Sequence, residues 1–431
     1  MLAWLGFSTI LVFLILIISK RLSVMTALVL TPIFFGLLAG FGFQDLGKFA
    51  LDGIKQVAPT GILLMFAVLY FATMLDAGLF DPVVAFIVKT VKGDPLKVVL
   101  GTAILTMIVH LDGDGTATFM IVLSAFLPIY KKLNISRLVL ATVVALSVGP
   151  LHLVPWSGTS ARAISTLKTD AVHIFNPNVP AIFGGICWVI FVAYYLGKKE
   201  RKRLGIIDFE YNHQANLSTE QKHLRRPKLI FLNAILTVAL ILSLMKGWVP
   251  APVLFVVAAM VALLINYPKL ADQQKVLKGH GTNIFLVSSM IFAAGIFSGI
   301  LTGSKMIEAM ASGLVTFIPQ DHANLLPMLT AVTSLPASML FTPDAYYFGV
   351  VPILSETAVQ FGINPLEIGR AALLGQMTVG FPISPLTAST FLLVGLAEVD
   401  LGEHQRHTFL WAWGTTLIMT LFAILTSSLH I

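Results

Sequence analysis

Two carboxylates lie close together in an otherwise uncharged stretch of the chain. Asp112 and Asp114 belong to the run HLDGDGTAT, which contains no Lys or Arg. Carboxylate oxygens are preferred ligands of Mg²⁺ and Ca²⁺, and repulsion between neighbouring acids favours a proton on one of them. The run therefore predicts a divalent-metal or proton site. Asp344, in the run SMLFTPDAY, is assigned the same role, and plain solvation of these acids is the alternative.

Three basic side chains could act together with these acids. His110 and His152 could relay protons or, when charged, contact an anion, and each could equally be a packed, hydrogen-bonded histidine. Arg162 ends the run GPLHLVPWSGTSAR, and its guanidinium fork matches the shape of a carboxylate. The alternative for Arg162 is a side chain that extends to the lipid headgroups. The predicted proton-coupling residues are Asp112, Asp114, His110 and His152.

Hydroxyl and glycine residues fill the same polar segments. Ser and Thr hydroxyls, with backbone amides at the start of a half-helix, could hold an anionic ligand, although they also join membrane helices to one another. Glycine lets the backbone approach a ligand closely. The predicted substrate-binding residues are Gly113, Gly115, Thr116, Thr118, Ser157, Gly158, Thr159, Ser160, Arg162, Ser384, Thr387, Ser389 and Thr390.

The elements that position these residues must cross a membrane. Charged residues make up only 11% of the 431 residues, against about a quarter in an average soluble protein. Apolar stretches such as 62–79 and 284–301 approach the roughly 20 residues that span a bilayer core. The single cysteine, Cys187, excludes a disulfide framework and a Cys-rich metal site.

An internal repeat organises the spans. Phe71 and Phe292 are 221 residues apart, and Pro155 and Pro385 are 230 apart, with similar motifs around each pair. In the predicted topology the two copies have opposite orientations, as in carriers that build a site at the bilayer midplane. The predicted fold is an all-α polytopic membrane protein, an inverted-repeat transporter with about ten full spans, two re-entrant hairpins and two broken helices.

Five segments follow from this repeat. The expected organisation is N-terminal spans (1–59), a first inverted repeat (60–197), a basic loop (198–228), connecting spans (229–282) and a second inverted repeat (283–431). The hairpins are expected at about 98–130 and 324–356, and the broken helices at about 137–168 and 366–400.

The basic residues set the expected orientation. Lys and Arg concentrate on the cytoplasmic side of membrane proteins, and residues 198–228 contain nine of them against four acids. We therefore expect this loop in the cytoplasm and both termini outside a cell membrane. A cytoplasmic retention loop explains these charges better than a nucleic-acid patch does, so no nucleic-acid partner is expected.

The runs HLDGDGTATFM, PLHLVPWSGTSARA and GFPISPLTASTFLLVG resemble those of the CitMHS family, the citrate-metal:proton symporters of the ion transporter superfamily. The resemblance covers nearly the whole chain. It implies proton-driven uptake of citrate complexed with Mg²⁺ or Ca²⁺, a co-transported metal and no permanently bound cofactor. It further implies a homodimer with an elevator-like transport domain. The runs DGDGTAT and TPDAY replace the superfamily's Ser-Asn-Thr tips, which favours an acid-lined metal or proton site over a sodium-only site.

The charge balance is compatible with such a cargo. Citrate carries about three negative charges near pH 7, and one divalent ion leaves about one. A site with one Arg and several acids suits this complex better than bare citrate. The alternatives are a related carrier for a dicarboxylate, gluconate or arsenite, and, more distantly, an intramembrane aspartyl protease built on Asp114 and Asp344. The visible repeat argues against the protease, so no enzyme activity is expected.

Overall fold

The computed structural model describes residues 1–19, 21–91, 93–206, 219–316, 318 and 320–430. Regular structure in these ranges is helical. Six helical segments are long and apolar enough to cross a membrane, and further apolar helices have 10–17 residues. The predicted all-α membrane fold is confirmed, while the count of about ten full spans stays a prediction.

The first half of the chain forms a bundle of long helices with one hairpin and one interrupted helix. The hairpin consists of α5 and α6, joined by the short 3₁₀ turn η1, and the interrupted helix consists of α7 and α8. In order, the elements are α1 (Leu2–Ile18), α2 (Val24–Leu38), α3 (Phe43–Ala77), α4 (Asp81–Thr90), α5 (Pro95–Val109), η1 (His110–Asp112), α6 (Gly115–Lys132), α7 (Arg137–Leu151), α8 (Gly158–Thr166) and α9 (Ala171–Leu204).

The second half repeats the order from α3 to α9. Here the hairpin consists of α15, the π-helical segment η4 and α16, and the interrupted helix consists of α17 and α18. The elements are α13 (Leu270–Gly303), α14 (Met306–Val315), η3 (Gln320–Leu325), α15 (Leu326–Ala337), η4 (Ala345–Val350), α16 (Val351–Gln360), α17 (Pro365–Leu373), α18 (Ala388–Ala397) and α19 (Leu401–Leu425).

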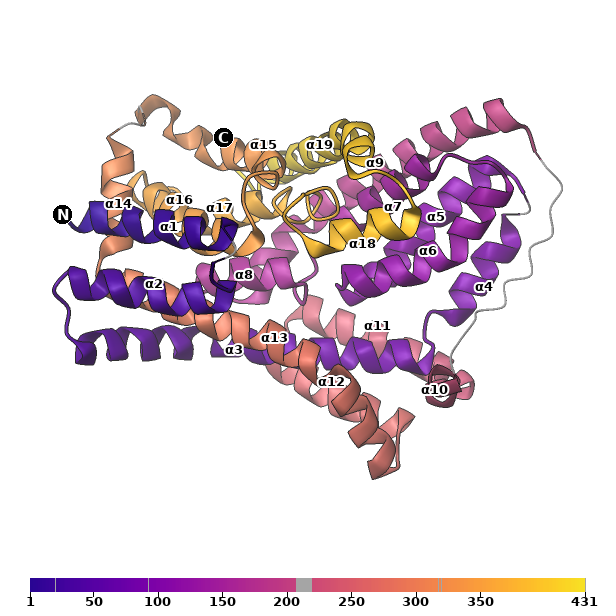
Figure 1. Ribbon diagram of the computed structural model, residues 1–431, viewed down its shortest axis with the longest axis horizontal. Coiled ribbons are helices and arrows are strands. Elements are labelled where there is room, and N and C mark those ends of the chain that lie inside the picture. Colours follow the sequence, from indigo (N-terminus) through magenta and orange to yellow (C-terminus); the bar gives the residue numbers. More distant parts are fainter. Residues whose placement is uncertain (20, 92, 207–218, 317, 319, 431) are drawn as a thin grey trace.

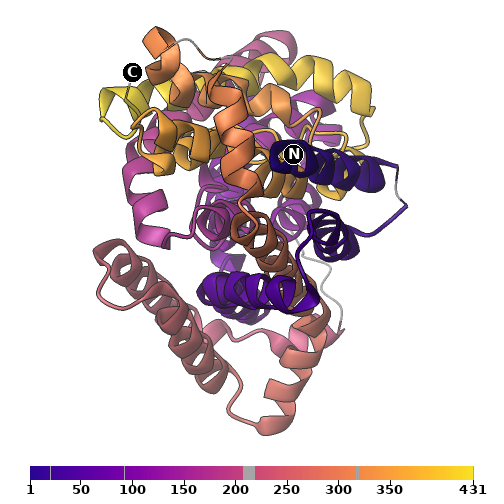
Figure 2. The same ribbon diagram turned by 90° about the vertical axis from the view of Figure 1, so that its left-hand side faces the viewer.

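Between the halves lie α10 (Thr219–Leu224), η2 (Pro227–Leu229), α11 (Ile230–Lys246) and α12 (Ala251–Asn266). The helix α12 packs against α3, and α11 and α12 project from the rest of the bundle in Figure 2. Residues 207–218 of the predicted basic loop lie outside the described residues.

Three helices continue past the expected segment boundaries. The boundaries after residues 59, 197 and 282 fall inside α3, α9 and α13, each of which has 34 or 35 residues. The first half of α3 carries Lys48 and Lys55 on exposed positions. Charged residues lower the local hydropathy without breaking a helix, so a span read from hydropathy alone begins too late.

The helices α3 and α13, which are related by the repeat, pack against each other through glycines. A Cβ atom added at Gly53 would lie 2.0 Å from the carbonyl oxygen of Gly295 and 2.8 Å from the Cα atom of Gly299. Small residues allow such close approach of membrane helices, and the van der Waals contact of the backbones then stabilises the pair.

The two hairpins enter from opposite ends of the molecule. In Figure 1, α5 and α6 of the first hairpin occupy the right half, whereas α15 and α16 of the second hairpin lie left of the centre. The helix α18 packs against α6 and α7, and α8 packs against both α3 and α13. This arrangement brings the interruptions of the helices to the middle of the bundle, where the predicted site residues are found.

Candidate functional site

The tip of the first hairpin is a turn closed by its two carboxylates. Gly113 adopts a left-handed conformation (φ 77°), which glycine tolerates without strain. A carboxylate oxygen of Asp112 accepts a hydrogen bond from the Asp114 amide at 2.9 Å, and Asp114 caps α6 by accepting from the Thr116 amide at 2.8 Å. Asp112 is buried and Asp114 is exposed. Asp114 is therefore the more accessible of the two carboxylates at the tip.

Two aromatic side chains cover the glycines of this tip. A Cβ atom at Gly113 would lie 3.1 Å from the Trp156 ring, and one at Gly115 would lie 2.4 Å from the Phe381 ring. Trp156 also donates its indole N–H to the Leu111 carbonyl at 2.9 Å. In this structure the small size of Gly113 and Gly115 leaves room for Trp156 and Phe381, which belong to the two broken helices. From the sequence, both glycines were predicted to let the backbone contact a ligand.

His110 and His152 form a buried pair between the first hairpin and the first broken helix. Their Nε2 and Nδ1 atoms are 2.9 Å apart, and their rings stack with centroids separated by 5.1 Å. The other ring nitrogen of His110 contacts the Thr118 hydroxyl at 3.0 Å, and Phe381 stacks on His152. The pair can pass a proton from one ring to the other along this hydrogen bond.

The first broken helix is interrupted between Leu151 and Gly158. The Ser157 hydroxyl accepts from the Ser160 amide at 3.1 Å and so caps α8, and it also donates to the His152 carbonyl at 2.6 Å. The Ser160 hydroxyl donates to the Leu153 carbonyl at 3.0 Å. Both hydroxyls thus satisfy backbone groups that the interruption leaves without helical partners, as buried backbone requires.

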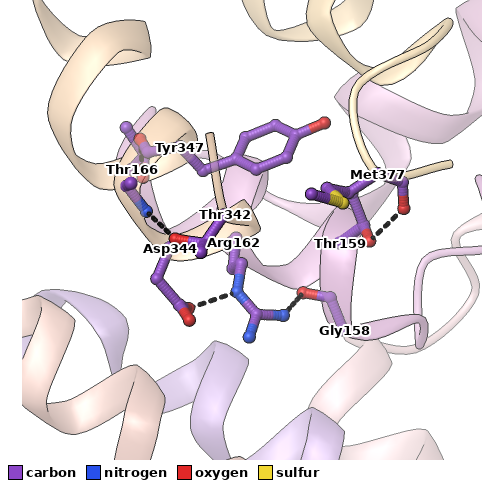
Figure 3. A network of polar contacts seen from close by, with 9 residues as sticks. Gly158, Thr159, Arg162, Thr166, Thr342, Asp344, Tyr347 and Met377 are labelled. Atoms are coloured by element: carbon purple, nitrogen blue, oxygen red, sulfur yellow. Dashed lines mark hydrogen bonds and ion pairs between the residues drawn. The ribbon is translucent and has the colours of Figure 1, made fainter. Parts of the chain in front are cut away.

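Arg162 joins this broken helix to the tip of the second hairpin (Figure 3). Its Nε atom donates to a carboxylate oxygen of Asp344 at 2.7 Å, and Nη1 donates to the Gly158 carbonyl at 2.8 Å. The side chain of Arg162 is 19% exposed and that of Asp344 is 8% exposed. Charge-assisted hydrogen bonds are about twice as strong as neutral ones, so this contact fixes the two elements relative to each other.

The two broken helices meet through Thr159 and Met377 (Figure 3). The Thr159 hydroxyl donates to the Met377 carbonyl at 3.0 Å. Met377 adopts a left-handed conformation (φ 52°), which turns its carbonyl away from the helical direction. The second interruption runs from residue 374 to 387, so it begins several residues before the expected run at Gly380.

Hydroxyls also hold the second interruption together. Thr387 and Thr390 both donate to the Phe381 carbonyl, at 2.8 and 3.0 Å, and Ser384 donates to the Ser338 carbonyl at 2.5 Å. Most predicted substrate-binding hydroxyls therefore bond to backbone in this structure. Among the predicted substrate-binding hydroxyls, all of which lie in the described part of the chain, those of Thr116 and Ser389 make no hydrogen bond. Thr116 lies in the first turn of α6, and Ser389 lies in the first turn of α18.

The predicted metal ligands are not gathered into one cluster. In the described part of the chain, no group of three or more His, Cys, Asp and Glu side chains could hold a metal ion. Asp112 bonds to the hairpin turn, and Asp344 bonds to Arg162. A divalent ion at this site would need most of its ligands from another molecule, and the carboxylates of a bound anion could supply them.

Several residues at the site were not predicted from the sequence. Tyr347 donates its hydroxyl to the Gln376 carbonyl at 2.9 Å, and the Ser338 hydroxyl donates to the Gln376 side-chain oxygen at 2.9 Å. Thr166 donates to the Tyr347 carbonyl at 3.0 Å. Gln376 lies in an apolar run directly after a glycine, and this buried amide is the signal that could have located the start of the second interruption.

Comparisons with known proteins agree with this architecture. Among solved structures, the YdaH transporter of Alcanivorax borkumensis aligns with a TM-score of 0.65 at 13% identity, covering 90% of this chain and 89% of that chain. That likeness supports the fold alone. A Bacillus subtilis protein named "Citrate transporter" is 51% identical over 99% of both chains. A second Bacillus subtilis protein, named "Mg(2+)/citrate complex secondary transporter", is 48% identical over the full length of both.

The family comparison identifies the chain as a transporter. The model of the family CitMHS, described as citrate transporter, matches residues 11–375, which include both hairpins and the first broken helix. These residues hold the Arg162–Asp344 pair, the histidine pair and the first hairpin tip. The chain therefore belongs to the CitMHS family of citrate transporters.

Proposed function

We propose that this protein is a proton-coupled carrier that takes up citrate complexed with a divalent ion, Mg²⁺ or Ca²⁺. The observation that carries the proposal is the Arg162–Asp344 pair, which holds opposite charges where a broken helix meets a hairpin tip. The name of the 48% identical relative, which refers to a Mg²⁺–citrate complex, supports the choice of cargo.

The two partners of this pair match the two parts of the cargo. A citrate carboxylate can replace Asp344 on the guanidinium of Arg162, because the fork binds any carboxylate in the same geometry. The released Asp344 carboxylate is then available to the divalent ion, which prefers hard oxygen ligands. The Arg162–Asp344 ion pair is thus replaced by two contacts, one between Arg162 and citrate and one between Asp344 and the divalent ion. Both side chains keep a partner of opposite charge.

Proton coupling is assigned to the first hairpin. Asp112 and Asp114 offer carboxylates at the tip, and His110 and His152 provide a hydrogen-bonded path between the hairpin and the first broken helix. Since His152 lies ten residues before Arg162 on the same broken helix, proton binding and cargo binding act on one element.

The movement we propose is of the elevator type in a homodimer. The site elements contact α3 and α13 largely through α8 and η4, whereas α3 and α13 pack tightly against each other. A body with these contacts could slide along the α3–α13 pair as a unit. Both termini outside and residues 198–228 in the cytoplasm complete the proposed arrangement.

The test is uptake of labelled citrate into proteoliposomes across a panel of divalent ions and pH gradients. We expect uptake to require Mg²⁺ or Ca²⁺ and to accelerate when the outside is more acidic. Uptake that is indifferent to divalent ions would contradict the metal–citrate cargo. Uptake of a dicarboxylate, gluconate or arsenite in preference to citrate would favour a related carrier instead.

A further inference from the structure

A cavity of about 270 Å³ lies beside the candidate site and takes no part in it. Its walls come from α8, α13, α14, α16 and the start of α17, and from the connection after α8. The polar residues that line it are two acids, one base and four hydroxyl residues, namely Glu308, Glu356, Lys168, Thr166, Ser298, Thr302 and Ser355. This composition offers ligands to both a cation and an anion.

The base of this cavity is held in an unusual backbone conformation. Lys168 has a φ of 56°, in the left-handed region that non-glycine residues enter at a cost of about 1 kcal/mol or more. Glycine would close the end of α8 without this strain. The Lys168 ammonium donates a hydrogen bond to the Thr302 hydroxyl at 3.3 Å.

A second observation points to a missing partner. Ser355 belongs to the wall of the cavity, and its hydroxyl is buried and has no hydrogen-bond partner in the described part of the chain. Leaving a buried polar group unpaired costs about 1–3 kcal/mol. The charged lining and the strained Lys168 backbone favour a polar ligand here, and a small shift of Ser355 would give its hydroxyl a partner in that ligand.

We propose that this cavity is a second binding site for the metal–citrate complex, where the cargo docks before it reaches Arg162. Lys168 binds a free carboxylate of citrate, and the carboxylates of Glu356 and Glu308 attract the divalent ion. Thr166 lines the cavity one turn after Arg162 on α8, about 6 Å along the helix. The inference rests on the proposed function, because it takes the same cargo.

The charged walls would raise the local concentration of cargo and speed its capture. Removing the positive charge of Lys168 should therefore weaken the binding of metal–citrate to the cavity and raise the KM for citrate. The kcat at saturating citrate should stay unchanged. The informative change is Lys168→Asn, because asparagine tolerates the left-handed backbone and lacks the charge. Lys168→Arg keeps the charge, and Lys48→Asn changes an exposed lysine that does not line the cavity.

The experiment is equilibrium dialysis of labelled citrate with the full chain in nanodiscs, with and without Mg²⁺, beside uptake in proteoliposomes. With Mg²⁺ we expect two bound citrates per chain in the wild type, in Lys168→Arg and in Lys48→Asn, and one in Lys168→Asn. We expect Lys168→Asn to raise KM about ten-fold, the effect of losing one charge-assisted contact. Its melting temperature should not fall.

Three outcomes would overturn the second site. One is a single bound citrate per wild-type chain, another is a KM of Lys168→Asn equal to that of Lys48→Asn, and the third is a second citrate that binds without Mg²⁺. Failure of the proposed function is separate, since it would appear as wild-type uptake that ignores citrate or divalent ions. Normal Mg²⁺-dependent uptake with one bound citrate would reject the cavity alone.

Discussion

Arg162 makes two hydrogen bonds through different nitrogen atoms of one rigid, planar guanidinium. Its Nε atom binds Asp344, and its Nη1 atom binds the Gly158 carbonyl. The second contact orients the side chain, so that the remaining N–H groups face a fixed direction. A lysine at this position would keep the charge and lose this orientation.

We therefore expect Arg162→Lys to raise the KM for citrate about ten-fold or more, as loss of one charge-assisted hydrogen bond would do. The measurement is initial-rate uptake in proteoliposomes with saturating Mg²⁺. Arg137→Lys is the matched control, because Arg137 is half exposed and bonds to Glu398. Equal KM values for the two variants would place Arg162 outside the substrate site.

The hairpin carboxylates can be tested without disturbing the turn. Asparagine retains an oxygen that accepts the Asp114 and Thr116 amide hydrogen bonds, so Asp112→Asn preserves the turn and Asp114→Asn preserves the helix cap. We expect each change to abolish metal-dependent uptake, because the charge for an ion or a proton is lost. Membrane insertion and citrate counterflow are measured together, and near-wild-type transport by both variants would remove these acids from the site.

The histidine pair predicts a separation between net uptake and exchange. His110→Gln removes one ring of the hydrogen-bonded pair, while its amide can still contact the Thr118 hydroxyl. Uptake driven by a pH gradient should fall at least about ten-fold, whereas exchange of internal for external citrate, which needs no net proton movement, should persist. If both rates fall equally, the pair has a structural role.

At the scale of elements, the close contact of α3 with α13 depends on glycines, which have no side chain to hold the helices apart. Gly53→Ala would place a Cβ atom 2.0 Å from the Gly295 carbonyl oxygen and force the helices apart. We expect a loss of about 1–3 kcal/mol, the usual cost of overpacking, seen as a lower melting temperature in detergent. Gly279→Ala is the control, since no atom lies within 4 Å of its added Cβ. An unchanged melting temperature for Gly53→Ala would show that the pair can separate freely.

The hairpins and interruptions could be predicted from the sequence because their signals are local. Glycine, proline and polar residues in an apolar run mark backbone that leaves the helix. The contacts between them could not be predicted. Thr159 and Met377 are 218 residues apart, and the left-handed conformation of Met377 carries no sequence signature, since methionine normally avoids it.

The roles of the hydroxyls were also beyond sequence reasoning. A serine or threonine beside an interruption satisfies either a ligand or the freed backbone, and both uses require the same residue type. The geometry separates them, because Ser157, Ser160 and Thr387 bond to nearby carbonyls. Helix length was underestimated for a related reason, since hydropathy detects lipid contact and not the helix itself.

For the whole molecule, the family confirms a citrate transporter, and the chain is not an enzyme. The intramembrane protease alternative is thereby excluded. The Arg162–Asp344 pair agrees with this result, because an aspartyl protease needs its two acids together, whereas Asp344 here faces a cation.

The predicted orientation can be measured on intact cells. In a Cys187→Ser background, Lys48→Cys should react with a membrane-impermeant maleimide from outside, because α3 begins there in the predicted topology. Lys202→Cys, at the exposed end of α9, should react only after permeabilisation. The reverse labelling pattern would invert the proposed orientation of the whole chain.

The Arg162–Asp344 pair also bears on the proposed return of the carrier without cargo. In the proposed proton-coupled cycle the carrier returns without cargo, and moving an isolated charge into the bilayer interior is costly. With guanidinium and carboxylate joined at 2.7 Å, Arg162 and Asp344 compensate each other's charge. The return stroke would then be nearly indifferent to membrane voltage at this site, so the voltage would act mainly on the loaded stroke.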